Sequence, residues 1–301
     1  MNEIIWKEVD AIAEADPAQL VFESEKYFTN QVEAVARGIF DIPELRIVMI
    51  AGPSSSGKTT FCKLLSEQLE RNGVRAHRIS MDDFFIDRDK VPILPSGLKD
   101  YDGLDALDLE ELNRVIRGVL QSEWVELPEY NFVTGKSTRR VNLLRLHKED
   151  VVLIEGIHAL NPLPNKGIDM SRICRIGIKP RRTFVMPSGT RLSPDDLRLM
   201  RRTIRDYYTR AHSLEATLNQ WTEVCRAEAT YITPYINKAD YHIDSSFEYE
   251  LFVYKHCLKS LMEDCRLEAY SAIRSAMAEV REIPLIHIPA NSLLNEFAIL
   301  K

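Results

Sequence analysis

Gly52-Pro53-Ser54-Ser55-Ser56-Gly57-Lys58-Thr59 has the G-x-x-x-x-G-K-[ST] spacing of a phosphate-binding loop. The apolar run Ile47–Ala51 leads into it and predicts a buried parallel strand. The residues after it repeat at helical spacing, and Gly73 is expected to end that helix. Its apolar stripe consists of Phe61, Leu64, Leu65 and Leu69. The strand, loop and helix together predict a nucleoside-triphosphate site.

Each residue type in this loop has a part in holding phosphate. Glycine lets the backbone curl so that successive N–H groups face an anion, and the helix N-terminus adds partial positive charge. Lys58 is expected to reach the terminal phosphates, and the Thr59 hydroxyl is expected to hold Mg²⁺. The expected nucleotide-binding residues are Gly52, Ser54, Ser55, Ser56, Gly57, Lys58, Thr59 and Thr60.

The composition is that of a globular protein with a sizeable core, because 45% of the 301 residues are hydrophobic and 28% are charged. The formal net charge of -6 argues against a general nucleic-acid binder, and no stretch approaches a membrane span. The five cysteines lack C-x-x-C spacing, so we expect reduced thiols, a cytoplasmic location and no zinc site. We therefore expect a small-molecule partner, with neither nucleic acid nor membrane, and the sequence leaves homo-oligomerisation open.

Strands and helices alternate along the chain, which predicts an α/β fold with a parallel sheet covered on both faces. Further strands are expected at Val74–Ser80, Val151–Ile154, Ile173–Ile178 and Tyr241–Ile243. Long helical patterns occupy about 194–237 and 246–280. Residues 1–44 are expected to form a helical N-terminal extension that ends at Pro43.

Two carboxylates closely follow predicted strands. Asp82 comes after the strand that ends at Ser80, and Glu155 comes after the run that ends at Ile154. Because ligands bind at the carboxyl ends of parallel strands, both are expected to meet the phosphate loop in one crevice, within reach of Mg²⁺ or an acceptor hydroxyl. The alternatives are a helix N-cap for Asp82 and a solvated carboxylate for Glu155.

Four arginines lie at positions i, i+3, i+4 and i+7 of one helical pattern: Arg198, Arg201, Arg202 and Arg205. This spacing places them on one helix face, where like charges repel. A polyphosphate would remove that penalty, because guanidinium groups suit phosphate oxygens. The pattern predicts a lid helix that closes over a nucleotide, and Arg210 extends it. The alternative is a solvated face paired with Asp195, Asp196 and Asp206.

The segment Leu127–Lys136 mixes aromatic residues, a proline and polar groups without clear periodicity. Such a composition fits a loop or hairpin that stacks on a planar group. An ordinary packed hairpin explains the same pattern equally well.

Taken in order, these motifs resemble the uridine kinase and phosphoribulokinase family of P-loop kinases over roughly residues 45–260. The resemblance implies a P-loop NTPase three-layer α/β sandwich with a parallel sheet at 45–301. Within it, the resemblance implies a helical lid at about 181–212 and a C-terminal helical segment at about 246–301.

The chain also resembles the C-terminal half of longer bacterial proteins, in which a threonyl-tRNA-synthetase-like region precedes a uridine-kinase-like domain. The kinase-like motifs belong to that half. Residues 1–44 and the ending around Ile286–Phe297 carry this second likeness.

The resemblance assigns roles on the acceptor side. Met81-Asp82-Asp83-Phe84-Phe85 resembles the segment that carries the family's catalytic aspartate, which matches Asp82. Tyr101–Asp108 resembles the following acidic motif, whose first aspartate, here Asp102, holds ribose hydroxyls.

The same likeness extends to the hairpin. Pro128-Glu129-Tyr130-Asn131-Phe132 resembles the hairpin that contacts the pyrimidine, with Tyr130 at the stacking position. Gly135 stands where uridine kinases usually carry a histidine that contacts the base. This departure leaves a sugar-phosphate or polyol acceptor open, as in the phosphoribulokinase branch.

Residues 198–206 are similar to the family's lid helix. There Arg202, Arg205 and Arg210 match arginines that contact substrate and phosphate, and Arg201 is expected on the nucleotide side. Gln220 falls where a glutamine that contacts the base is expected.

The resemblance implies transfer of the ATP γ-phosphate to a small-molecule hydroxyl, the 5′-hydroxyl of a nucleoside. Asp82 would accept the proton, while Lys58 and Arg205 neutralise the developing charge. ATP and Mg²⁺ are the expected cofactors, with Mg²⁺ on Thr59, Asp82 and Glu155. A nucleotide-binding switch without an acceptor is the alternative from another class.

Overall fold

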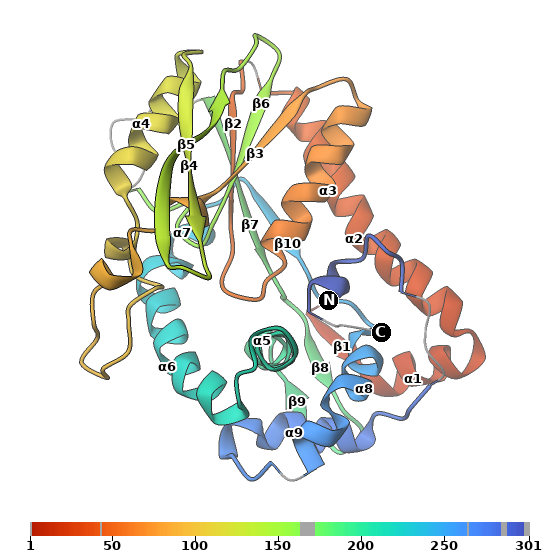
Figure 1. The fold of residues 1–301 in the computed structure, drawn as a ribbon. Coiled ribbons are helices and arrows are strands. Elements are labelled where there is room, and N and C mark those ends of the chain that lie inside the picture. Colours follow the sequence, from red (N-terminus) through yellow and green to blue (C-terminus); the bar gives the residue numbers. More distant parts are fainter. Residues whose placement is uncertain (1, 43, 163–171, 264, 284–287, 298–301) are drawn as a thin grey trace.

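The computed structural model describes residues 2–42, 44–162, 172–263, 265–283 and 288–297 (Figure 1). Pro43 and Ile286, which entered two of the expectations above, lie outside the described residues. The other expected strands fall within them, and residues 264, 284–287 and 298–301 of the expected C-terminal helical segment also lie outside.

A parallel sheet forms the centre of the molecule, as the sequence predicts (Figure 1). Its strands, in spatial order, are β10 (Tyr241–Asp244), β7 (Ile173–Lys179), β2 (Ile47–Ala51), β6 (Val151–Glu155) and β3 (Ala76–Ser80). Every residue of β2 and β6 is buried, which explains their continuous apolar sequences. Alternate residues of β2 face two separate cores, with Val48 and Ile50 in one, and Ile47 and Met49 in the other.

Helices complete the layers on both faces of this sheet (Figure 1). The helices are α1 (Trp6–Ala15), α2 (Pro17–Phe40), α3 (Lys58–Arg71), α4 (Leu109–Leu120), α5 (Pro194–Arg210), α6 (Leu214–Tyr231), α7 (Thr233–Ile236), α8 (Glu250–Glu263) and α9 (Ser271–Glu279). The core that contains α2 and α3 covers one face, and the core that contains α4 and α7 covers the other. The α/β three-layer architecture is therefore confirmed.

Two smaller pairings flank the central sheet. A hairpin of β4 (Val125–Asn131) and β5 (Lys136–Leu144) lies beside α4, so the segment that lacked periodicity is a hairpin. A second sheet has the order β1-β8-β9 and consists of β1 (Glu3–Ile5), β8 (Thr183–Val185) and β9 (Arg191–Leu192). Strands of two or three residues are too short for their pattern to stand out, and the sequence did not predict this sheet.

The N-terminal segment is helical, as expected, and its apolar side chains pack into the main core. Strand β1 pairs in parallel with β8, and Trp6 is 1% exposed. The Trp6 ring lies 4.6 Å from the Phe252 ring of α8 and 6.1 Å from the Phe184 ring of β8. Helix α2 packs on α3 through its apolar stripe. The periodicity revealed that stripe, but it held no information on what the stripe contacts.

The five cysteines all lie among the described residues and are free thiols, in agreement with the absence of C-x-x-C spacing. Across the described ranges, none of the helices combines the length and the apolar character that a membrane crossing requires.

Trp6→Ala should lower the free energy of unfolding by about 3–5 kcal/mol, because the substitution leaves a large cavity between β8 and α8. The matched control is Trp124→Ala, since Trp124 is 64% exposed in the turn before β4. Chemical denaturation followed by circular dichroism measures both variants. Equal, small effects from the two substitutions would mean that the N-terminal segment is a separable extension.

Candidate active site

The phosphate loop connects β2 to α3 at the carboxyl end of the sheet. Gly57 has φ of +88°, a left-handed conformation that favours glycine. A side chain on Gly52 would place its Cβ 2.3 Å from the carbonyl oxygen of Ile178, so glycine is required there as well. The buried hydroxyls of Ser55 and Ser56 have no hydrogen-bond partner in the part of the chain that the structure describes. The loop thus presents unpaired polar groups around the N-terminus of α3.

Lys58 and Thr59 lie in the first turn of α3. The Lys58 ammonium donates to the carbonyl oxygen of Pro53 at 3.2 Å, so it folds back over the loop. The Thr59 hydroxyl donates to Glu155 Oε1 at 3.1 Å. Ser80, at the end of β3, donates to the same Glu155 oxygen at 3.2 Å. These contacts bring the loop together with the ends of β3 and β6, as predicted from the positions of these residues at the carboxyl ends of strands.

Glu155 is 8% exposed at the end of β6. Burial is the main cause that raises the pKa of Glu155, and Asp82 raises it further, whereas Lys58 and the Thr59 hydrogen bond lower it. Asp82 follows β3 in a 3-10 turn, η1 (Met81–Phe84), which Ser80 caps. The N-cap role considered as the alternative for Asp82 is therefore taken by Ser80, and the Asp82 carboxylate lines the pocket.

The Asp82 side chain is open to solvent, although the surrounding protein displaces much of its hydration. This desolvation raises the pKa of Asp82, while the charges of Lys58, Arg210 and Arg205 lower it. Cations from α3 and α5 thus act on one carboxylate. Because its pKa is raised, Asp82 accepts a proton more readily than an ordinary surface aspartate does.

Thr59, Asp82 and Glu155 fit a hard cation such as Mg²⁺, because they offer a hydroxyl and two carboxylates at one edge of the sheet. Among the described residues, no three His, Cys, Asp or Glu side chains are grouped closely enough to hold a metal by themselves. Mg²⁺ usually keeps water and phosphate oxygens as ligands, so a small protein contribution suits it.

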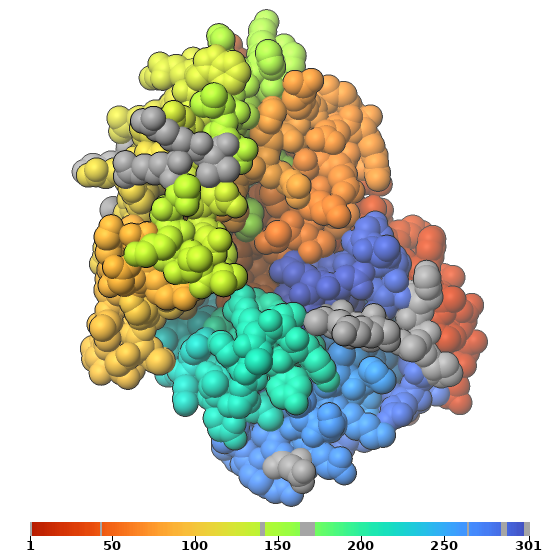
Figure 2. Space-filling model, viewed as in Figure 1, coloured from red at the N-terminus to blue at the C-terminus, as the bar shows by residue number. Residues whose placement is uncertain are grey.

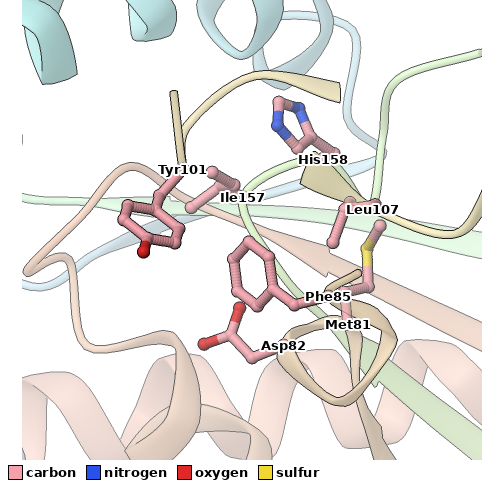
Figure 3. Close-up of a pocket in the computed structure, with 7 residues that line it drawn as sticks. All are labelled: Met81, Asp82, Phe85, Tyr101, Leu107, Ile157 and His158. Carbon is pink, nitrogen blue, oxygen red and sulfur yellow. The ribbon is translucent and has the colours of Figure 1, made fainter. Parts of the chain in front are cut away.

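A small pocket opens beside Asp82 (Figure 3). Its lining comes from the turn after β3, the acidic motif and the end of β6. The lining residues are Met81, Asp82, Phe85, Tyr101, Leu107, Ile157 and His158. Figure 3 shows that the Asp82 carboxylate and the rings of Phe85 and Tyr101 lie near one another at this pocket. The pocket combines aromatic and apolar walls with one carboxylate and one imidazole.

His158 was not predicted from the sequence. It is 1% exposed, and its Nε2 lies 3.0 Å from the backbone oxygen of Asp102. A carbonyl oxygen accepts, so Nε2 carries the proton. Burial lowers the pKa of His158 to about 4, which keeps the ring neutral near pH 7. Its place directly after Glu155-Gly156-Ile157, at a strand end, was the available signal.

Asp102 lies close enough to the other site residues for their charges to act on it. Burial raises the pKa of Asp102, and the charge of Arg202 lowers it. The negative charge of Asp82 also raises the pKa of Asp102, and the positive charge of Lys58 lowers it. The structure therefore brings together the acidic motif, the phosphate loop and α5, which the sequence had placed in one site.

Tyr130 differs from the expected stacking surface. It is 5% exposed, and its ring packs 5.5 Å from Phe85 and 4.9 Å from Phe132. The rings that line the pocket are those of Phe85 and Tyr101. The hairpin aromatics contact one another because β4 packs against η1, a contact that the local sequence pattern does not encode.

Gly135 has φ of +69°, and a Cβ at this position would lie 2.7 Å from Cβ of Arg88. The Arg88 amide donates to the Gly135 carbonyl oxygen at 2.8 Å. The space that a histidine would need at this position is therefore occupied by Arg88. A bulky side chain would meet both a strained backbone and a direct clash.

Helix α5 lies against the phosphate loop. Arg198 Nε donates to the Ser54 carbonyl oxygen at 3.0 Å, and Arg202 Nη1 donates to the Ser54 hydroxyl at 2.9 Å. Arg202 also donates to Gln220 Oε1 at 3.0 Å. Arg202 and Gln220, both expected on the substrate side, thus contact each other beside the loop.

The arginine charges of α5 are neutralised by carboxylates of the protein, which the sequence did not predict in full. Arg201 and Glu250 form an ion pair at 2.8 Å with both side chains 0% exposed. Arg198 pairs with Glu228 at 2.6 Å, and it also pairs with the predicted Asp195. The predicted Asp206 contacts Arg202, Arg205 and Arg210. These partners offset the repulsion among the arginines, and α5 rests on the loop; closure over a nucleotide stays a prediction.

A parallel sheet, a phosphate loop at the end of its central strand and an arginine helix docked on that loop define a P-loop kinase fold. The sequence profile of the "Phosphoribulokinase / Uridine kinase family" matches residues 47–164 and 192–250. The chain belongs to this family.

Individual relatives agree with this assignment. Uridine-cytidine kinase 2-B from Danio rerio is 30% identical over 184 residues, which cover 58% of this chain and 63% of that protein. A uridine kinase from Lactobacillus helveticus is 28% identical over 175 residues, covering 58% of this chain and 74% of the relative. The chain therefore spans less than two thirds of the Danio rerio protein's length.

One solved structure, described as a candidate fructose transport system kinase from Silicibacter sp. TM1040, superimposes with a TM-score of 0.52. It is 18% identical, and the superposition covers 70% of this chain and 98% of that one. At this identity the likeness supports the fold alone.

Glu250→Gln should lower the free energy of unfolding by about 3–5 kcal/mol, because it leaves the buried Arg201 charge without its partner. The matched control is Glu248→Gln, whose side chain is 37% exposed in its ion pair with Arg182, and it should cost at most about 1 kcal/mol. Denaturant titration gives both values. A Glu250→Gln protein as stable as the parent would show that α5 is not held by this pair.

Proposed function

We propose that this protein is an ATP-dependent kinase that phosphorylates the 5′-hydroxyl of a nucleoside. The observation that carries the proposal is the meeting of Lys58, Asp82 and Glu155 beside a pocket lined by aromatic rings. Phosphoryl transfer needs charge neutralisation and an aligned acceptor, and this edge of the sheet offers groups for both. Family membership supports the class of reaction.

Asp82 accepts the proton of the acceptor hydroxyl in the proposed reaction. It lines the pocket, and its pKa is raised by desolvation, so it can take a proton that a surface carboxylate would not hold. Lys58 and Arg205, whose charges reach Asp82, neutralise the charge that develops on the transferring group. Thr59, Asp82 and Glu155 would hold Mg²⁺, and the bound ion would neutralise charge on the phosphate groups.

Asp102 is the group that would hold the two ribose hydroxyls. A carboxylate can accept two hydrogen bonds at once, and the His158 contact fixes the backbone of Asp102. Phe85 and Tyr101 supply the flat apolar surfaces against which a base can lie. Asp102 and the rings of the neighbouring pocket together support an acceptor that has both a diol and an aromatic ring.

The second candidate acceptor is a sugar phosphate or another polyol. The observation that favours it is Arg88, whose side chain fills the space beside Gly135 and donates to the Phe132 carbonyl oxygen. An arginine suits a phosphate group better than a pyrimidine edge. A nucleotide-binding switch, the candidate from another class, has no use for the pocket beside Asp82.

The acceptor panel separates these candidates. On the proposed function, kcat/KM should be highest for ribonucleosides and should fall by about tenfold or more for 2′-deoxynucleosides, because the diol contact to Asp102 is lost. The measurement is ATP consumption with uridine, cytidine, purine nucleosides and sugar phosphates. Turnover with a sugar phosphate only would assign the protein to the second candidate. Slow hydrolysis that no acceptor changes would indicate a switch.

Asp82→Asn should lower kcat by about 10²–10⁴ with little change in ATP affinity, because it removes a proton acceptor and keeps the shape. The parent should lose activity as the pH falls through the raised pKa of Asp82, and the variant should lack that limb of the profile. The control is Asp83→Asn. The neighbouring Asp83 carboxylate accepts a hydrogen bond from the backbone of Tyr130 and does not line the pocket.

Steady-state kinetics and ATP titration distinguish the outcomes. If Asp82→Asn abolishes ATP binding and Asp83→Asn does not, Asp82 holds the metal and the proton acceptor lies elsewhere. Lys58→Ala serves as the reference for loss of phosphate contacts, and it should lose both binding and turnover.

A further inference from the structure

The C-terminal segment Ser292–Phe297, which contains the 3-10 turn η6 (Leu293–Glu296), packs on the phosphate loop. Figure 2 shows this segment, in dark blue, on the surface next to α3. Leu293 and Leu294 are 0% exposed, and Phe297 is 1% exposed. Side chains buried to this extent hold the segment in place against the rest of the protein.

Glu296 approaches the N-terminus of α3 directly. Its Oε2 accepts from the Thr60 hydroxyl at 2.7 Å and from the Thr60 backbone N–H at 3.4 Å. Thr60 lies in the first turn of α3, where backbone N–H groups have no partner within the helix and the local charge favours an anion. The Glu296 carboxylate therefore occupies an anion position of the phosphate loop.

Two further contacts hold the segment over the loop. A Cβ on Gly57 would lie 2.3 Å from Leu293 Cδ1, so the Leu293 side chain rests directly on the loop backbone. The Arg201 guanidinium lies 5.2 Å from the centre of the Phe297 ring, and Arg201 also donates to the Ser55 carbonyl oxygen at 3.5 Å. Leu293, Glu296 and Phe297 thus contact the Gly57 end of the loop, the first turn of α3 and the arginine helix.

We infer that Glu296 is a built-in competitor of ATP, and that the nucleotide binds only when its α-phosphate takes the place of the Glu296 carboxylate on Thr60. This inference rests on the proposed function, since it concerns the same donor site. The N–H groups of a phosphate loop cradle the α- and β-phosphates. Two anions cannot share one hydroxyl and one N–H at close range without strong repulsion.

The buried apolar residues beside Glu296 determine which part of the segment can move when ATP binds. Displacing Leu293, Leu294 and Phe297 would expose three apolar side chains to water, which is unfavourable. Rotating the Glu296 side chain away from Thr60 exposes only a carboxylate, which water solvates well. The apolar residues therefore keep the segment beside the loop, and the Glu296 side chain is the part that leaves.

The consequence is a lowered apparent affinity for ATP. When only a fraction of the molecules has a free site, the apparent Kd equals the intrinsic Kd divided by that fraction. Glu296→Gln and Glu296→Ala remove the charge and leave the apolar contacts in place. Both should therefore lower the Kd for ATP by about tenfold, the equivalent of one charged hydrogen bond.

The experiment is calorimetric titration of the full chain with MgATP and no acceptor. Glu282→Gln is the matched control: it removes one C-terminal carboxylate that pairs with Lys259 at the surface, and its Kd should equal that of the parent. Melting curves check that each variant is folded. If a Glu296 variant fails this check, the other variant carries the test.

The outcomes separate the two proposals. Tighter ATP binding by the Glu296 variants, with an unchanged control, supports the competitor role. An unchanged or raised Kd would overturn it, because Glu296 would then be neutral toward the nucleotide or a ligand of it. If the parent and every variant fail to bind MgATP, the proposed ATP-dependent function itself is overturned, and the inference falls with it.

Discussion

Arg201 and Glu250 carry opposite charges into a region that water does not reach, and the arrangement of the site depends on this pair. Removing a guanidinium and a carboxylate from water costs several kcal/mol for each ion, and their attraction offsets that cost only when the geometry is held. Helices α5 and α8 must therefore keep fixed positions relative to each other. Arg201 also donates to the carbonyl oxygens of Ser245 and Ser55, so the turn after β10 and the phosphate loop belong to the same arrangement.

This constraint explains why segments at both ends of the chain surround the donor side. Trp6 packs on Phe252 of α8, and Arg281 pairs with Asp10 of α1 at 2.8 Å. The N-terminal helices thereby support the helix that carries Glu250. Phe297 lies over the Arg201 guanidinium on the other side. Contacts far from the phosphate loop in sequence therefore fix the position of the arginine helix on it, as expected when a buried ion pair has to be held by its surroundings.

The sequence predicted the parts of the site that are encoded locally. The phosphate loop, Asp82 and Glu155 could be located because each belongs to a strand end, and parallel strands bring their carboxyl ends to one edge. The arginine spacing also identified a helix face correctly, but it held no information on Glu228 or Glu250, which come from distant elements. The roles of His158 and Glu296 were not predicted for the same reason, since their contacts join residues far apart in the chain. Patterns of short period report which face of an element is buried, and they do not report its partner.

The hairpin tip and the turn after β6 differ in the side chains that they can carry. The left-handed backbone at Gly135 and the side chain of Arg88 leave no room for a histidine at the hairpin tip. The imidazole of this pocket instead comes from His158, just after β6, and its Nε2 is committed to the backbone of Asp102. His158 lies in the turn that follows Glu155, the last residue of β6. The carboxylate of the proposed metal site and the imidazole that contacts Asp102 therefore come from one short stretch of the chain. The contact between His158 and Asp102 joins the acidic motif to the carboxyl end of the central sheet.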